Sequence, residues 1–264
     1  MGMKKECAQV VSQECLAENI YSMWLETGIA KNSRSGQFIL VYPNDASRLL
    51  GRPICICRVG DDKKELRIVY RAQGEGTRSF TALKPGDSVF IEGPLGNGYD
   101  ISGVKGKEVL LIGGGIGAPS LLQLAADLKR ADTGRTTAVL GYRDSLLDNF
   151  LADEFKELCD DTVIATDDGS FGIRGNVIDA VKSSDIRADV IFACGPMVML
   201  KAVASLALSQ GAEAYISLEE RMACGVGACL GCVVKTKETD SHSHVKNARI
   251  CTEGPVFNAS EVEL

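Results

Sequence analysis

The stretch LLIGGGIGAPSLL, Leu110 to Leu122, decides how the middle of this chain folds. An apolar run ends in glycines, as expected of a strand that is buried on both faces, and a helical pattern follows it. A strand, a glycine loop and a helix in this order present free backbone N–H groups to a phosphate. The candidate dinucleotide-binding residues are therefore Gly113, Gly114, Gly115 and Gly117. Plain turn geometry is the alternative use of these glycines.

Strand and helix patterns continue to alternate beyond this stretch. The next predicted strand ends in GYRD, Gly141 to Asp144, without the acidic residue of the usual dinucleotide fingerprint. Arg143 is placed where it could contact the 2′-phosphate of NADP, but one arginine does not decide whether the nucleotide is NAD or NADP. Strands are expected at 108–113, 136–142, 162–166, 188–194 and 213–218, and helices at 120–130, 149–159, 176–182 and 197–210. This alternation predicts a doubly wound parallel sheet of five strands.

Two further turns lie at carboxyl ends of these strands, where ligands bind in such sheets. Cys194, Gly195 and Pro196 end the fourth strand and are candidates for the nicotinamide side of the site. The stretch TDDGSFGIRGNV, 166–177, follows the third strand. The alternative for 194–196 is an ordinary strand-to-helix turn, and the alternative for 166–177 is a surface loop.

The residues before this region show a different sequence pattern. Partly alternating β-branched and aromatic runs at 37–42, 65–71 and 88–93 are bounded by turn clusters, which predicts an antiparallel barrel or sandwich. The last 40 or so residues fit neither pattern and hold four of the ten cysteines. We therefore expect three parts, at 1–102, 103–218 and 219–264.

Four cysteines form the pattern C-x4-C-x2-C-x18-C, namely Cys224, Cys229, Cys232 and Cys251. This order and spacing is the plant-type arrangement for a 2Fe–2S cluster, and the glycines between the ligands let the chain loop closely around it. Zinc is an alternative, because His242 and His244 lie between the third and fourth cysteines, although in a polar run typical of an exposed hairpin tip. Disulfides are the other alternative. Small buried or half-buried positions are expected for Cys7, Cys15, Cys57 and Cys159.

The overall composition excludes several classes of protein. The 264 residues carry a net charge of −6 with no basic run, which argues against a nucleic-acid partner. No stretch approaches the ~18 uninterrupted apolar residues of a membrane span, and no secretory apolar region follows the polar start. We expect a cytoplasmic protein whose cysteines are reduced, and in such proteins cysteine clusters more often bind metal.

Several motifs in order resemble those of a known family. RPIC (52–55), GGGIGAP (113–119) and CGP (194–196) are similar to the flavin and nucleotide motifs of the ferredoxin–NADP reductase superfamily. Within it, VYR (69–71), GEGT (74–77), TDDGSFGIRGNV, LEERMACGVGACLGC (218–232) and CTEGPVF (251–257) resemble the electron-transfer subunits of dihydroorotate dehydrogenase B. The resemblance spans nearly the whole chain.

This resemblance implies a fold of β plus α/β type, with an N-terminal antiparallel FAD-binding β-barrel, an NAD-binding α/β domain and a small C-terminal 2Fe–2S segment. It implies that Arg52 and the backbone of Gly76 and Thr77 hold the FAD phosphates. The flavin would be bordered by Pro53, Ile54 and Cys55, with Val69, Tyr70 and Arg71 beside it. Cys55 stands where the family usually has Ser or Thr, and Ile54 stands where the superfamily has Tyr.

The implied function is that of an oxidoreductase subunit in pyrimidine biosynthesis. Electrons would pass from the FMN of a separate dihydroorotate-oxidising subunit through the 2Fe–2S cluster and FAD to NAD+, with Cys194 on the nicotinamide side. The family implies a heterotetramer with two copies of each chain. Two alternatives remain: another flavin and iron–sulfur reductase subunit that serves ferredoxin or a hydrogenase, and a zinc-stabilised binding module without activity.

Overall fold

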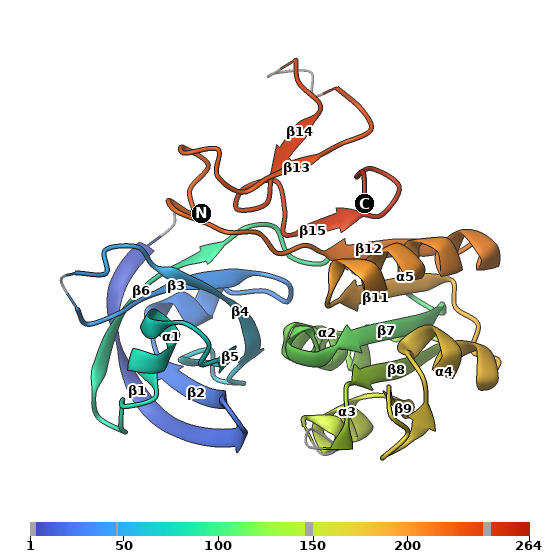
Figure 1. Cartoon of the computed structure of the whole chain (residues 1–264), viewed down its shortest axis with the longest axis horizontal. Coiled ribbons are helices and arrows are strands. Elements are labelled where there is room, and N and C mark those ends of the chain that lie inside the picture. The colour runs from blue at the N-terminus through green and yellow to red at the C-terminus, as the bar shows by residue number, and fades with distance from the viewer. Residues whose placement is uncertain (1–3, 46, 146–149, 240–243) are drawn as a thin grey trace.

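A computed structural model describes residues 4–45, 47–145, 150–239 and 244–264. A β-barrel and an α/β domain lie side by side, and the C-terminal segment covers the junction between them (Figure 1). No helix within these ranges is long and apolar enough to cross a membrane.

The N-terminal part is a closed antiparallel barrel, so the barrel expectation is confirmed and the sandwich alternative is wrong. Its strands follow the spatial order β1-β2-β5-β4-β3-β6. Their side chains alternate between solvent and a core that includes Met23, Ile39 and Leu66. The strands are β1 (Lys4–Ala17), β2 (Ile20–Glu26), β3 (Phe38–Tyr42), β4 (Arg52–Val59), β5 (Glu65–Arg71) and β6 (Ser88–Leu95), with the short helix α1 (Glu75–Phe80) and the 3-10 turn η1 (Gly28–Asn32) between them.

Strands β1, β2 and β4 were not among the predicted strands. In β1, eight of the 14 side chains are exposed and only Ala8 and Val10 are buried. Cys7 and Cys15 lie on this strand and are exposed, so the expectation that they are at least half-buried is wrong. Cys57 and Cys159 are buried, as expected.

The central part is the predicted doubly wound sheet, which is confirmed. Its five predicted strands are parallel and follow the order β9-β8-β7-β11-β12, within a sheet of seven strands. They are β7 (Glu108–Gly114), β8 (Arg135–Tyr142), β9 (Asp161–Thr166), β11 (Val190–Cys194) and β12 (Glu213–Ser217). The helices are α2 (Pro119–Lys129), α3 (Ala152–Leu158), α4 (Val177–Ser183) and α5 (Met197–Gln210), with the 3-10 turn η2 (Gly115–Gly117) before α2. The expected helix at 149–159 is observed from Ala152, and Asn149 lies outside the described residues.

Alternation along β7 explains why the sheet is covered on both faces. Val109 and Leu111 belong to the core that contains α2 and α3, whereas Leu110 and Ile112 belong to the core that contains α4 and α5. A run of consecutive apolar residues such as 109–112 needs this cover on both faces, because successive side chains in a strand point to opposite faces. The first core also takes in barrel residues such as Cys57 and Val69, so α2 packs against the barrel.

The C-terminal segment is joined to the sheet, which the sequence patterns did not predict. Strand β15 (Val256–Asn258) pairs antiparallel with β12, and the two-residue strand β10 (Ile173–Arg174) extends the opposite edge. Strands β13 (Val233–Lys235) and β14 (Asn247–Arg249) form a hairpin. His244, at the end of its connection, is exposed, and His242 lies outside the described residues.

Candidate functional site

A cavity of about 300 Å³ lies where the three parts of the chain meet. Ligand pockets of this size commonly lie at domain junctions. Strands β4 and β5 form its barrel wall, Ile116 and Ser120 come from the glycine loop and α2, and Met222 and Pro255 come from the C-terminal segment. Seven of the nine residues predicted on the flavin side line it: Pro53, Ile54, Cys55, Val69, Tyr70, Arg71 and Thr77.

The other two, Arg52 and Gly76, lie against each other beside the cavity. The Arg52 guanidinium donates to the Leu50 carbonyl at 2.7 Å, and a Cβ atom on Gly76 would lie 2.5 Å from Arg52 Nε. The absence of a side chain at Gly76 therefore makes room for the guanidinium at the start of α1. A guanidinium beside free backbone N–H groups suits a phosphate, so these residues fit the phosphates of FAD.

Tyr70 gives the cavity an aromatic wall. Its ring stacks on Tyr21 with centroids 5.8 Å apart, and its hydroxyl donates to Gln13 Oε1 at 2.9 Å. Burial raises the pKa of Tyr70 well above its usual range, so its hydroxyl stays protonated. Tyr70 thus presents a fixed aromatic ring in a cavity where Ile54 occupies the position of the superfamily's tyrosine.

Two thiols lie near the cavity in neutral form. Burial is the main cause that raises the pKa of Cys55 well above its usual range and that of Cys194 to about 12. Cys55 lines the cavity, whereas Cys194 ends β11 and is fully buried behind it. Neither thiol is poised to act as a thiolate nucleophile.

The predicted nucleotide residues gather at the carboxyl ends of two adjacent strands. Gly113 on β7 pairs with Cys194 on β11, and a Cβ atom on Gly117 would lie 2.6 Å from the Cys194 carbonyl oxygen. A Cβ atom on Gly114 would similarly meet Pro196 and Met199. The glycine loop and the Cys194–Pro196 turn are therefore in contact, as a single nucleotide-binding edge requires.

The four predicted ligands form two pairs in the C-terminal segment. Cys224 and Cys229 are in side-chain contact, as are Cys232 and Cys251. The first pair lies on the outer loop, and the second pair is buried. No three His, Cys, Asp or Glu side chains in the described ranges are grouped as ligands of one metal ion.

Backbone N–H groups point at the outer pair of sulfurs. Cys224 Sγ accepts from the Val226 and Cys229 N–H groups at 3.5 and 3.4 Å, and Cys229 Sγ accepts from Gly231 N–H at 3.4 Å. The Val226 N–H makes the largest contribution to lowering the pKa of Cys224 to about 6. For the inner pair, burial and the neighbouring Cys232 thiol raise the pKa of Cys251 to about 12.

This donor set fits a two-iron cluster. Each iron of a four-cysteine 2Fe–2S centre takes two thiolates, and the four sulfurs are already sorted into two pairs. Positive φ angles of 68° at Gly225 and 81° at Gly227 turn the chain around the outer pair.

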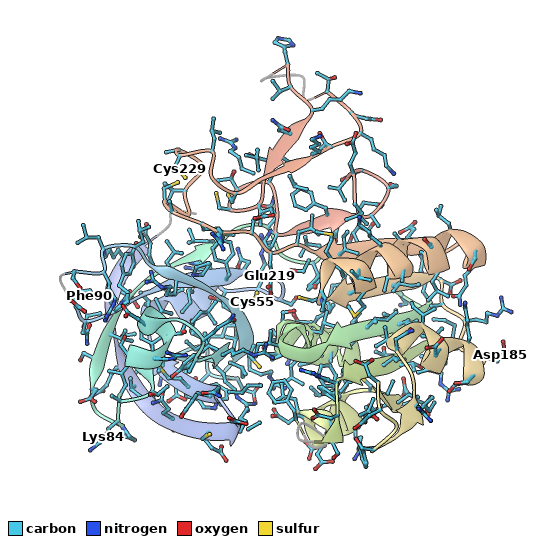
Figure 2. The ribbon with its side chains drawn as sticks, in the orientation of Figure 1. Cys55, Lys84, Phe90, Asp185, Glu219 and Cys229 are labelled. Atoms are coloured by element: carbon cyan, nitrogen blue, oxygen red, sulfur yellow. The ribbon has the colours of Figure 1, made fainter. Side chains whose placement is uncertain are left out.

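The sequence interpretation missed Glu219 and Ser120, which also line the cavity. Glu219 is the second residue after β12, at the same carboxyl edge of the sheet as the predicted nucleotide residues. That position was a signal in the sequence, because ligands of such sheets bind at this edge. Figure 2 shows Glu219 and Cys55 at the junction between the barrel and the parallel sheet, below the loop that carries Cys229.

Comparison with known families supports the iron–sulfur interpretation. A family described as the iron–sulfur cluster binding domain of dihydroorotate dehydrogenase B matches residues 219–263. A dihydroorotate dehydrogenase B (NAD(+)) electron transfer subunit from Streptococcus mutans is 41% identical over 261 residues, 98% of each chain. The protein of the same name from Bacillus pumilus is 41% identical over 265 residues, 99% of each chain.

Solved structures show the same fold. The NADH-dependent reduced ferredoxin–NADP oxidoreductase, studied for flavin-based electron bifurcation, aligns with a TM-score of 0.84 and 29% identity, over 97% of this chain and 89% of that one. A Neisseria gonorrhoeae ferredoxin NADP+ reductase with bound FAD and NADP aligns with a TM-score of 0.63 and 12% identity, over 83% and 94% of the two chains.

Proposed function

Because this chain belongs to the family of dihydroorotate dehydrogenase B electron-transfer subunits, we propose that it passes electrons from a dihydroorotate-oxidising partner to NAD+ in pyrimidine biosynthesis. The observation that carries the proposal is the cavity bordered by the barrel, the nucleotide edge and the cysteine segment at once. Residues suited to bind an iron–sulfur cluster, a flavin and a nicotinamide all lie around this cavity. The family that matches the C-terminal segment binds an iron–sulfur cluster by its description, so the alternative of a zinc-stabilised binding module has no support.

Each part of the chain has a distinct task in this proposal. FAD, when bound, exchanges single electrons with an iron–sulfur cluster and a hydride with NAD, which links the two carriers. Arg52, Gly76 and Thr77 bind its phosphates, and Pro53 to Cys55 with Val69 to Arg71 orient its ring. The proposed NAD-binding residues are Gly113, Gly114, Gly115, Gly117, Gly195 and Pro196. Cys224, Cys229, Cys232 and Cys251 ligate the 2Fe–2S cluster.

The cluster segment offers a surface for the partner. No charged residue lies between Met222 and Val234, and Val226, Leu230 and Val233 are exposed by 38%, 61% and 38%. An uncharged surface over a redox centre suits an interface, because desolvating charge at an interface core is costly. We propose that this surface meets an FMN-containing catalytic subunit, in a cytoplasmic assembly of two copies of each chain. We also propose the three-part division at 1–102, 103–218 and 219–264.

The similarity to the ferredoxin–NADP oxidoreductase makes a second function worth testing, in which the chain serves ferredoxin instead. The purified chain should show flavin and 2Fe–2S absorption in the visible spectrum. Mixed with the dihydroorotate-oxidising subunit of the same cell, it should reduce NAD+ only when dihydroorotate is present. Absence of either chromophore would contradict the proposal, and NADH turnover with ferredoxin but never with dihydroorotate would favour the second function.

Substitution of Cys194 tests the nicotinamide side. Because Cys194 abuts the glycine loop at the end of β11, Cys194→Ala should let this edge relax and should slow reduction of the bound flavin by NADH by roughly 10- to 100-fold. Stopped-flow absorbance measures the rate, with iron and FAD content unchanged. Cys159→Ala removes another buried thiol at the end of α3 and should leave the rate as it is. If both variants reduced the flavin at the same rate, Cys194 would not belong to the nicotinamide site.

A further inference from the structure

Tyr99 lies in a short connection after β6 that touches all three parts of the chain. The N–H of Asn97, two residues earlier, donates to the Gly254 carbonyl of the C-terminal segment at 2.6 Å. The N–H of Tyr99 donates to the Ser35 carbonyl of the barrel at 3.0 Å. The Tyr99 ring packs edge-on against Phe192 of β11, with centroids 5.4 Å apart. This connection therefore joins the barrel, the parallel sheet and the C-terminal segment.

The ring of Tyr99 has little freedom to move. A Cβ atom on Gly36 of the barrel would lie 2.8 Å from Tyr99 Cδ2, so the barrel backbone packs directly on the ring. Tyr99 is only 8% exposed. Burial, followed by the nearby Cys194 and Cys55 thiols, raises the pKa of Tyr99 well above its usual range. The hydroxyl therefore stays protonated, and the barrel sets its position.

The Tyr99 hydroxyl lies in a buried group of polar side chains beside the flavin cavity. It is in side-chain contact with Ser120 at the start of α2 and with Ser217 at the end of β12. Both serines also contact the Cys194 thiol at the end of β11. Ser120 lines the cavity, and its hydroxyl donates to the Gly117 carbonyl of the glycine loop at 2.8 Å. We call Tyr99, Ser120, Cys194 and Ser217 the polar cluster.

Two hydroxyls of the polar cluster are unpaired. Within the described part of the chain, Tyr99 Oη and Ser217 Oγ are buried and complete no hydrogen bond of ordinary geometry. A buried hydroxyl without a partner is costly, and a native structure that keeps one calls for an explanation. Hydrogen bonds around a reacting centre are often poorly aligned until the reacting partners are in place. The unpaired hydroxyls therefore point to a use for the polar cluster beyond packing.

The relative position of the barrel and the nucleotide edge matters for the proposed reaction. In that reaction, barrel residues hold the flavin and the nucleotide edge holds the nicotinamide, so a hydride crosses the junction between them. A misplacement of about 1 Å can slow such a transfer by about 100-fold. The polar cluster connects the two sides, because Tyr99 is anchored in the barrel whereas Ser120 and Cys194 belong to the nucleotide edge.

We propose that Tyr99 is a positioning residue for hydride transfer, whose hydroxyl holds the glycine loop and the Cys194 turn at the correct distance from the flavin. Tyr99 acts through Ser120, Ser217 and Cys194 rather than on the reacting atoms. It takes up and releases no proton, since the hydride carries one proton and both electrons directly between flavin and nicotinamide. The inference rests on the proposed function and names a residue that supports it.

Tyr99→Phe tests this role, because it keeps the ring and removes one oxygen atom. With saturating NADH, flavin reduction in the FAD-loaded chain should slow by about tenfold. The NADH concentration that gives half the maximal rate should stay the same, because the polar cluster orients the nicotinamide side and leaves the phosphate contacts of the glycine loop in place. Stopped-flow absorbance measures both quantities.

Tyr215→Phe is the matched control. Tyr215 also packs on Phe192, with centroids 5.5 Å apart, but its hydroxyl donates to Glu213 Oε2 at 3.4 Å, on its own strand. Removal of this hydroxyl should leave the maximal rate of flavin reduction at the wild-type value.

The infrared S–H stretch of Cys194 supplies a readout that does not depend on turnover. Its band is the one that Cys194→Ala removes, and its frequency reports the hydrogen bonding of the thiol. Tyr99→Phe should shift this band, because Ser120 and Ser217 lose their contact with the Tyr99 hydroxyl and rearrange around the thiol. Tyr215→Phe should leave the band where it is.

Ser217→Ala removes the second unpaired hydroxyl and should slow flavin reduction as Tyr99→Phe does. The double variant should be little slower than either single variant, because both changes act on the same contacts. If Tyr99→Phe does not fold, the rate of Ser217→Ala decides. A wild-type rate, or a lowered melting temperature with an unchanged Cys194 band, would overturn the inference. Failure of the wild type to couple dihydroorotate oxidation to NAD+ reduction would instead overturn the proposed function.

Discussion

Replacing any one of Cys224, Cys229, Cys232 and Cys251 by serine is expected to lower the bound iron of the purified chain by roughly tenfold or more. The thiolate is the form of cysteine that binds metal, and a serine hydroxyl stays protonated near neutral pH. The loss of any one sulfur also breaks one of the two pairs that hold the irons. Iron analysis and the visible absorption of the cluster measure the effect, and FAD should remain bound because its cavity belongs mainly to the barrel.

The other cysteines provide the controls for this result. Serine at Cys7 or Cys15, which are exposed on β1, and at Cys159, which is buried beside α3, should leave the iron content unchanged. The Cys159 variant separates loss of a ligand from general damage to a buried position. If one of these three variants lost as much iron as the four ligand variants, the assignment of the cluster to the C-terminal segment would be wrong.

Gly76→Ala is expected to weaken FAD binding by about 100-fold or more. The added Cβ atom would lie 2.5 Å from Arg52 Nε, so the guanidinium must leave its place beside α1. Charge-assisted hydrogen bonds contribute about 1.5–3 kcal/mol each. Two such bonds lost to a phosphate amount to about 3–6 kcal/mol, at roughly 1.4 kcal/mol for each tenfold in affinity. Titration of the deflavinated chain with FAD, followed by flavin fluorescence, measures the change.

A neighbouring glycine offers a matched control. Gly74 precedes the same helix with an extended backbone, and a Cβ atom there would meet nothing within 4 Å. Gly74→Ala should therefore bind FAD normally. Arg52→Ala should lose as much affinity as Gly76→Ala, and the double variant should be no worse than Arg52→Ala alone, because both changes remove the same contact. Additive losses would show that Gly76 acts in another way.

Local patterns in the sequence were sufficient for much of this fold. Buried apolar runs and helical spacing predicted the five parallel strands and their helices, because residue periodicity reports which face of each element is covered. The barrel strand β1 escaped prediction because its apolar residues are scattered among polar ones and only Ala8 and Val10 are buried. The exposure of Cys7 and Cys15 was missed because the prediction rested on residue type alone, and cysteine is usually a buried residue.

Residue patterns alone were enough to predict the alternation of strands and helices, the glycine loop and the order and spacing of four cysteines. Each of these features depends on residues that are close together in the chain, or on residue types that have few other structural roles. Folding was needed to show that β15 extends the sheet beside β12, that Gly76 leaves room for Arg52, and that Glu219 lines the same cavity as Cys55. These features depend on which distant segments meet and on how much water their contact removes.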